Sequence, residues 1–381
     1  MSVPLRKQVY RFDTSYTWDQ LLRDSVVDVE LLRRILLIRI NETIAIGPVQ
    51  KRAAPFMKQH HVPALGRRGR IGDRVITEKL QSACLVLHGK AAGRDDVRAA
   101  VRKIRDEGFP IEVRVTWEAG DATRFAREAA EAGHAVVIAG GGDGTVNEVV
   151  VGLADAAPAI NSLPSLAILP LGTANDLARA CNIPLDPFAA LHLAVTGPTA
   201  EVDLGRANQR WFLNLATGGF GAQVTVATPN ALKKILGAAA YLVTGITHFT
   251  SIRPAQGRFS GPGFNWEGAF LVLAVGNGRQ AGGGHQLCPE ALLNDGLLDV
   301  HLLPQLPNDE LSEVLGALLR EGTDAVRRTV ISARVPWLEF DADEPLQINL
   351  DGEPIADSRF RFEAVPGRLG MKLPPGCPLL A

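Results

Sequence analysis

Cysteine is scarce in this 381-residue sequence, and no cysteine has a partner at motif spacing. The four cysteines are widely separated: Cys84, Cys181, Cys288 and Cys377. They form neither a CxxC pair nor a Cys/His zinc pattern, so no zinc module is recognisable from the sequence. We expect reduced thiols in a cytosolic protein.

Long apolar runs are also missing. The two longest candidates, 26–40 and 235–250, are interrupted by charged or polar residues and do not reach the about 18 apolar residues of a membrane span. The N-terminus lacks an apolar core followed by a small-residue cleavage site. We therefore expect no transmembrane segment and a cytoplasmic protein, which would reach a membrane lipid only by transient association.

Neither sign of charge dominates the chain, but charge is unevenly distributed. The net charge of −1, with 46% hydrophobic and 21% charged residues, is typical of a soluble globular protein and gives no sign of a nucleic-acid partner. Residues 1–80 carry 15 Lys/Arg against 8 Asp/Glu, a net charge of +7. We expect either a poorly ordered basic extension or a start codon that is placed too early, with Met57 as a possible internal start. A basic segment that binds the membrane surface is the alternative.

The hydrophobic pattern predicts two domains of different architecture. Strand and helix patterns alternate four times in 81–205, with strands expected at 83–88, 111–116, 135–139 and 166–169. This alternation indicates β-α-β units and a parallel sheet. Short β-type runs separated by Gly and Pro turns then predict a mostly antiparallel β-domain over 206–360, followed by a C-terminal segment, 361–381.

A glycine-rich loop joins the strand expected at 135–139 to a helix expected from Thr145. The segment 140–148 reads Gly-Gly-Gly-Asp-Gly-Thr-Val-Asn-Glu. Glycine N–H groups at a helix N-terminus bind phosphate. The loop is neither a Walker A motif nor a dinucleotide fingerprint. A carboxylate at Asp143 suits such a loop if Mg²⁺ bridges it to phosphates; a Gly-rich turn with an Asp cap is the alternative.

Three further segments carry chemistry. In 166–179 (LAILPLGTANDLAR), Thr173 and Asp176 follow the next parallel strand, so this loop should face the same crevice, unless it only caps a helix. Asp351-Gly352-Glu353 places two carboxylates on one side of an extended chain, which suits phosphoryl transfer to an alcohol. The same segment is equally an ordinary hairpin turn. The turn Asn294-Asp295-Gly296 holds a metal or only turns the chain.

Together these motifs resemble the diacylglycerol kinase catalytic family, and within it the bacterial lipid kinases of the YegS type. The resemblance covers nearly 300 residues and rests on segments that include 113–129, 135–149, 166–178, 216–222, 275–298, 349–354 and 373–380. It implies an N-terminal α/β domain like that of NAD kinases, a C-terminal β-sandwich, and a final strand that returns to the first domain. The nucleotide site would lie between the domains.

The resemblance also implies roles for individual residues. ATP contacts fall on Thr116, Gly142, Asp143, Gly144, Thr145, Val146, Asn147, Glu148 and Thr173. Asp143 and Asp176 match carboxylates near the phosphates and the catalytic metal, and Glu353 matches the proposed proton acceptor, with Asp351 beside it. A structural Mg²⁺ site, with Ca²⁺ as the alternative ion, falls on Leu292, Asp295 and Leu297.

Two features depart from the family pattern. His88-Gly89-Lys90 replaces the Asn-Pro that many members have after the first strand, and the basic extension has no counterpart. We predict an ATP-dependent lipid kinase that acts on diacylglycerol, phosphatidylglycerol or a similar lipid and serves phospholipid biosynthesis. NAD kinase and a non-catalytic nucleotide- or lipid-binding regulator are the alternatives. The sequence leaves open the lipid and the oligomeric state, a dimer included.

Overall fold

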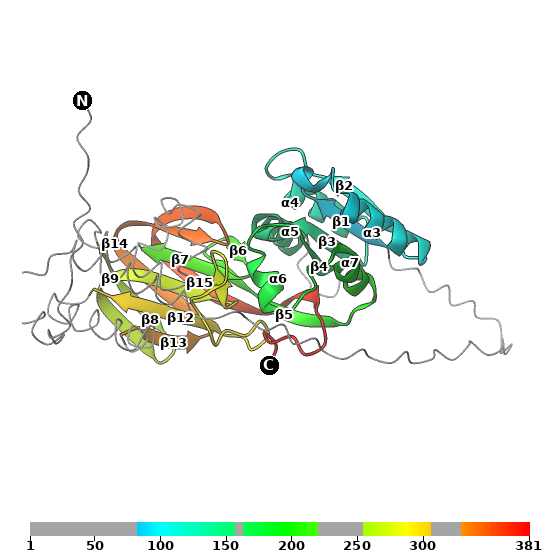
Figure 1. Cartoon of the computed structure of the whole chain (residues 1–381). Coiled ribbons are helices and arrows are strands. Elements are labelled where there is room, and N and C mark those ends of the chain that lie inside the picture. Colours follow the sequence, from blue (N-terminus) through cyan, green and yellow to red (C-terminus); the bar gives the residue numbers. More distant parts are fainter. Residues whose placement is uncertain (1–81, 157–162, 220–253, 306–328) are drawn as a thin grey trace, which may run out of the picture. The chain divides into compact units, whose positions relative to one another are not determined.

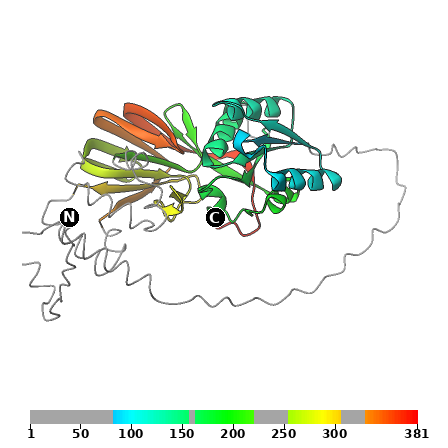
Figure 2. The ribbon, with the colours of Figure 1, turned by 45° about the horizontal axis from the view of Figure 1, so that its top comes forward.

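The computed structural model describes residues 82–156, 163–219, 254–305 and 329–381 (Figure 1). The extension expected at 1–80 lies outside the described residues. Within the described residues, helices are confined to the N-terminal part of the chain and the C-terminal part consists of strands (Figure 2). None of the described helices has the length and apolar character needed to cross a membrane.

Four parallel strands form the centre of the N-terminal body. They are β1 (Ala83–Leu87), β2 (Ile111–Val115), β3 (Val136–Gly141) and β4 (Ser165–Pro170). Their order in the sheet is β2-β1-β3-β4, and each neighbouring pair is parallel. Apolar residues fill β1, β3 and β4, as expected of strands that are covered on both faces.

Helices cover both faces of this sheet. They are α3 (Asp95–Asp106), α4 (Asp121–Glu131), α5 (Asp143–Ala156), α6 (Asp176–Ala180) and α7 (Pro187–Thr196), with a 3₁₀ turn, η1 (Gly89–Ala91). Alternate residues of β1 face opposite ways, so that Cys84 and Val86 pack with α4 and α5. Leu85 and Leu87 pack with α3 and α7 on the other face.

The C-terminal body is built from antiparallel strands. The larger ones are β5 (Thr199–Ala207), β6 (Arg210–Phe212), β7 (Leu215–Gly219), β8 (Ala255–Gly261), β9 (Phe264–Gly276), β12 (Leu298–Pro304), β13 (Ile331–Val335), β14 (Trp337–Leu350) and β15 (Glu353–Lys372). A short hairpin pairs β10 (Gln280–Ala281) with β11 (His285–Gln286). Stacked and edge-to-face phenylalanines, among them Phe259, Phe270 and Phe340, fill the core of this body.

Strand β15 is shared by the two bodies. Its first half pairs with β14, and its second half pairs with β5. Near its end, Met371 pairs in parallel with Leu166 of β4. Leu369, Met371 and Leu373 lie in the same buried cluster as the α4/α5 face of the sheet. The last strand therefore completes the core of the first body.

Apart from shifts of one or two residues at the ends of β1 to β4, two elements differ from those expected. Helix α5 begins at Asp143 instead of Thr145, so the glycine loop is shorter than the sequence indicates. One of the short β-type runs of the sequence, 210–215, is predicted as a single strand but is divided between β6 and β7, which are separated by Leu213 and Asn214. The break has a physical cause: the N–H groups of 213–215 bind the carboxylate of Asp351.

Candidate functional site

A cavity of about 1210 Å³ lies where the carboxyl ends of β3 and β4 meet the C-terminal body. Open α/β sheets bind ligands at this end of their strands. Nine of the residues singled out from the sequence line the cavity: Gly142, Asp143, Gly144, Val146, Asn147, Thr173, Asp176, Asp351 and Glu353. The structure therefore gathers the three predicted loops around one space.

The two glycine-containing loops are packed directly against each other. A Cβ on Gly172 would lie 2.5 Å from the Cα of Gly142, so a side chain there would push the loops apart. Gly142 also caps α5, since its carbonyl oxygen accepts the N–H of Val146 at 3.1 Å. A Cβ on Gly144 would meet nothing within 4 Å, and the residue lines the cavity at the helix N-terminus. That end of α5 is a ready anion site.

Asp143 is the first residue of α5 and lies beside the first turn of α6. Burial raises the pKa of its carboxyl above the ordinary value, and the charge of Asp176 raises it further. Hydrogen bonds from the backbone N–H groups of Asp176 and Leu177 partly offset this. A carboxylate under these conditions gains from a nearby cation.

Asp176 is buried and already hydrogen-bonded within the protein. Its carboxylate accepts the N–H of Gly283 at 2.9 Å and that of Gly284 at 2.6 Å, and the side chain of Gln280 donates to its carbonyl oxygen at 2.8 Å. Asn175, in the left-handed region with φ 50°, closes the preceding turn by exchanging two hydrogen bonds with Gly172. The hairpin β10–β11 thus fixes α6 from the other body.

Asp351 and Glu353 do not lie on one side of an extended chain, and that expectation is wrong. Asp351 has φ 47° and Gly352 φ 107°, because they form the turn between β14 and β15. The carboxylate of Asp351 faces inward and accepts N–H groups of Leu213 at 2.7 Å and Leu215 at 2.7 Å. Burial raises its pKa, and these N–H groups oppose the rise. Glu353, by contrast, is exposed and lines the cavity.

Three predicted nucleotide contacts lie outside the cavity lining. Thr145 is buried beneath Gly141. The hydroxyl of Thr116 accepts the N–H of Gly89 at 3.2 Å. The carboxylate of Glu148 accepts the N–H of Gly120 at 3.1 Å. In this arrangement Thr116 and Glu148 tie neighbouring loops of the N-terminal body together, and Thr145 packs within the glycine loop.

The predicted structural-ion residues also lie outside the cavity lining: Leu292, Asp295 and Leu297. Asp295 is ion-paired with Arg334, which also reaches Asp299 at 3.3 Å. Burial raises the pKa of Asp299 and of Asp203, and the charge of Asp295 raises both pKa values further. Two carboxylates therefore share one guanidinium, which leaves an excess of negative charge that a divalent cation would offset.

The cavity lining also has more carboxylates than Lys or Arg side chains. Six carboxylate residues line it: Asp143, Asp176, Glu290, Asp299, Asp351 and Glu353. Among the described lining residues, Arg334 is the one Lys or Arg. A nucleoside triphosphate would be repelled by these walls unless divalent cations came with it. Oxygen-rich walls of this kind suit Mg²⁺.

Two models of known protein families match this chain. A family model described as the diacylglycerol kinase catalytic domain matches residues 82–207. A second, described as the YegS C-terminal NAD kinase beta sandwich-like domain, matches residues 215–372. The chain belongs to the YegS-like diacylglycerol kinase family. It is therefore a kinase that transfers phosphate to an alcohol group.

Relatives of this YegS-like kinase carry consistent names. A protein of Pseudomonas aeruginosa named "Probable lipid kinase YegS-like" is 56% identical over 78% of this chain and 95% of its own length. One of Stenotrophomonas maltophilia with the same name is 51% identical over 78% and 97%. A crystal structure of a diacylglycerol kinase from Bacillus anthracis shares the fold, with a TM-score of 0.59, 22% identity, and coverage of 78% of this chain and 99% of that one.

One wall of the cavity of this YegS-like kinase is largely apolar. Along β9, Leu273 and Val275 point into the phenylalanine-rich core, whereas Val272 and Ala274 line the cavity. The same alternation puts Leu303 of β12 on the cavity side. A sheet that covers the core with one face thus offers its other face to the cavity.

Sequence reasoning missed several residues of the site in this YegS-like kinase. Asn214 lines the cavity and donates to the carbonyl of Gln280 at 2.6 Å, yet no charge or glycine pattern marks it in the sequence. Gly283 and Gly284 belong to a glycine run visible in the sequence, but only folding brings them to Asp176. Asn147 was expected, and its buried Oδ1 lacks a hydrogen-bond partner in the described part of the chain.

Proposed function

We propose that this kinase transfers the γ-phosphate of ATP to a hydroxyl of a membrane lipid such as diacylglycerol or phosphatidylglycerol. One observation carries the proposal: phosphate-loop glycines, carboxylates and an apolar wall line the same cavity. Its volume of about 1210 Å³ exceeds the roughly 300–1,000 Å³ typical of a site for one small ligand. Two substrates that must meet, one of them apolar, suit such a space.

The phosphates of ATP bind at the N-terminus of α5. Gly142 and Gly144 present backbone there without side chains, while Thr173 and Asn147 line the same space. Mg²⁺ held at Asp143 would neutralise the charge that develops on the transferred phosphoryl group. Asp176 keeps α6 in place beside Asp143 and adds to the field that attracts the ion.

Glu353 accepts the proton of the lipid hydroxyl. Its carboxylate is exposed in the cavity and follows directly on the turn that Asp351 anchors. Asp351 is occupied by N–H groups of the chain, so its role is to position Glu353 rather than to take the proton. The two carboxylates predicted from the sequence therefore have different tasks.

A structural divalent ion, Mg²⁺ or Ca²⁺, binds Asp295 and the carbonyl oxygens of Leu292 and Leu297. The excess of carboxylate over guanidinium around Arg334 supports it. The ion would secure the turn that precedes β12. The protein works from the cytoplasmic side and meets its lipid by transient contact with the membrane.

Phosphorylation of lipid vesicles tests the assignment. Purified full-length protein receives γ-labelled ATP, Mg²⁺ and vesicles that contain diacylglycerol, phosphatidylglycerol or neither. We expect Glu353→Gln to lose about 10²–10⁴-fold in lipid labelling, the usual worth of a general base. Asp143→Asn, which weakens the site for Mg²⁺, should lose labelling as well. Glu344→Gln changes an exposed carboxylate of β14 outside the cavity lining and should retain activity.

Two outcomes would replace the proposal. Formation of NADP in a parallel incubation with NAD, without labelled lipid, would make the protein a NAD kinase. Saturable ATP binding without turnover on any lipid would indicate a regulator. Equal lipid labelling by all four proteins would reject the roles of Glu353 and Asp143.

A further inference from the structure

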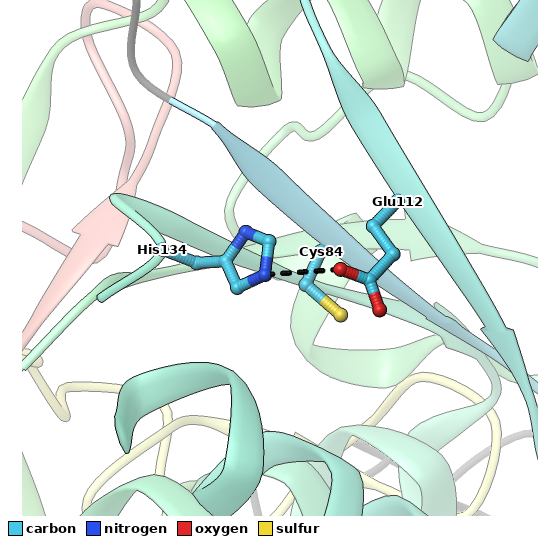
Figure 3. Close-up of side chains that lie close together, drawn as sticks. All are labelled: Cys84, Glu112 and His134. Atoms are coloured by element: carbon cyan, nitrogen blue, oxygen red, sulfur yellow. Dashed lines mark ion pairs between the residues drawn. The ribbon is translucent and has the colours of Figure 1, made fainter. Parts of the chain in front are cut away.

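A second group of reactive side chains lies at the opposite end of the parallel sheet. Cys84 of β1 and Glu112 of β2 are register partners at the amino ends of their strands, and His134 precedes β3 by two residues. Their donor atoms all lie within 4.8 Å of one another. Figure 3 shows the sulfur, the carboxylate and the ring nitrogen converging. The cavity lies at the carboxyl ends of these strands, so this group is separate from it.

We propose that Cys84, Glu112 and His134 bind one divalent transition-metal ion of the Zn²⁺ type, with a fourth position open to water. Thiolate, imidazole and carboxylate are the protein ligands that Zn²⁺ takes, and three of them with an open position form a recognised set. Nε2 of His134 lies 3.3 Å from Oε2 of Glu112. Two ligands about 2.0–2.1 Å from a tetrahedral ion are separated by about 3.3 Å.

A neighbouring guanidinium orients the carboxylate of this set. Arg114 donates from Nε to Oε1 of Glu112 at 2.6 Å, which leaves Oε2 turned toward His134. Arg114 is itself held by Oε2 of Glu128 at 2.8 Å. Outer groups that fix a ligand's orientation in this way support metal sites.

The local charge also favours a dication. With the thiol ionised, the connected groups Cys84, Glu112, Glu128 and Asp121 against Arg114 and Arg124 sum to −2, which one divalent ion cancels. Burial raises the pKa of the Cys84 thiol to about 11, so the ion displaces the thiol proton to solvent as the metal–sulfur bond forms.

Nδ1 of His134 is buried without a hydrogen-bond partner in the described residues, so the ring has no outer acceptor. We therefore expect moderate affinity.

Sequence spacing does not reveal this site. The three ligands are 28 and 22 residues apart in sequence, as their numbers show, and each comes from a different strand or strand entrance. Pairing of β1 with β2 and β3 brings them together. The inference does not depend on which lipid or nucleotide the cavity binds.

Titration with Co²⁺ tests the proposal, using full-length protein in excess Mg²⁺. We expect a near-ultraviolet thiolate-to-cobalt charge-transfer band that saturates at one ion per chain and disappears on addition of Zn²⁺. Residues 1–81 contain no cysteine, so cobalt bound at the adjacent His60 and His61 cannot give this band. The charge-transfer band therefore reports a cysteine within residues 82–381.

Variants assign the band to this cluster. Cys84→Ser should abolish it, and Glu112→Gln and His134→Gln should weaken cobalt binding at least tenfold. Cys288→Ser changes another buried cysteine outside the cluster and should leave the band intact. Should Cys84→Ser not fold, judged by circular dichroism, His134→Gln still decides. Absence of the band in the wild type, its persistence in Cys84→Ser, or an unchanged cobalt affinity in His134→Gln overturns the proposal.

Discussion

Asp121 and Asp143 each stand at the first turn of a helix, but their surroundings move their pKa values in opposite directions. Backbone N–H groups of Trp117 and Glu118 and the guanidinium of Arg124 lower the pKa of Asp121 to about 2. Burial and the charge of Asp176 raise that of Asp143. The first carboxylate is satisfied within the protein, whereas the second needs a cation. The contrast separates a carboxylate that stabilises the fold from one that, under the proposed function, holds Mg²⁺.

Asp121 gives a pH-dependent prediction. Because its folded pKa is depressed, its contribution to stability is present above the unfolded value of about 3.9 and is lost as pH falls toward about 2. Asp121→Asn should therefore lower the urea midpoint at about pH 7, and the gap to wild type should narrow at about pH 3. Asp106→Asn, at an exposed position, serves as control. A gap that is equal at both pH values would contradict the prediction.

At the scale of elements, the contact between the two glycine loops predicts an effect on nucleotide binding. In Gly172→Ala the new Cβ would lie 2.5 Å from the Cα of Gly142 and 2.9 Å from Oδ1 of Asn175. We expect the KM for ATP to rise at least tenfold, with roughly 1–3 kcal/mol lost from the free energy of unfolding. Steady-state kinetics and denaturant titration measure the two effects.

A second Gly→Ala substitution, at an uncrowded position, is the control for Gly172→Ala. Gly93→Ala places a methyl group where nothing lies within 4 Å, on an exposed turn. It should leave both the KM and the stability close to wild type. An unchanged KM in Gly172→Ala would show that the loops can separate without harm to the nucleotide site.

The elements also show how far the sequence alone predicts this protein. Apolar runs such as 83–88 and 135–139 have strand character in themselves, so their positions follow from local pattern. The break between β6 and β7 does not, because its cause is a carboxylate 136 to 138 residues further along the chain. The site divides in the same way. Glycine loops and acidic motifs are visible in the sequence, whereas Asn214 and the anchoring of Asp176 depend on contacts between distant segments.

At the scale of the whole molecule, the cavity and the basic extension are separable. Every described cavity-lining residue lies between Gly142 and Glu353, and the family match begins at residue 82. We expect a chain beginning at Thr77 to phosphorylate detergent-dispersed lipid as the full chain does. Its binding to anionic vesicles should weaken, because residues 1–76, which it lacks, carry 14 Lys/Arg against 7 Asp/Glu.

Co-sedimentation with anionic and with neutral vesicles measures the second effect, and only the anionic arm should change. Equal binding of both chains to anionic vesicles would remove any membrane role from the extension. Loss of activity on dispersed lipid would show that the extension supports catalysis directly.

The sharing of β15 has a consequence for synthesis of the protein. While the ribosome is still making the C-terminal body, β4 has no partner on its outer side among the described strands, and Leu166 awaits Met371. The N-terminal body thus carries an open sheet edge until β15 has been synthesised. A chain that stops before β15 lacks the strand that closes this edge. Folding of the first body is therefore completed only after the strands of the C-terminal body have been made.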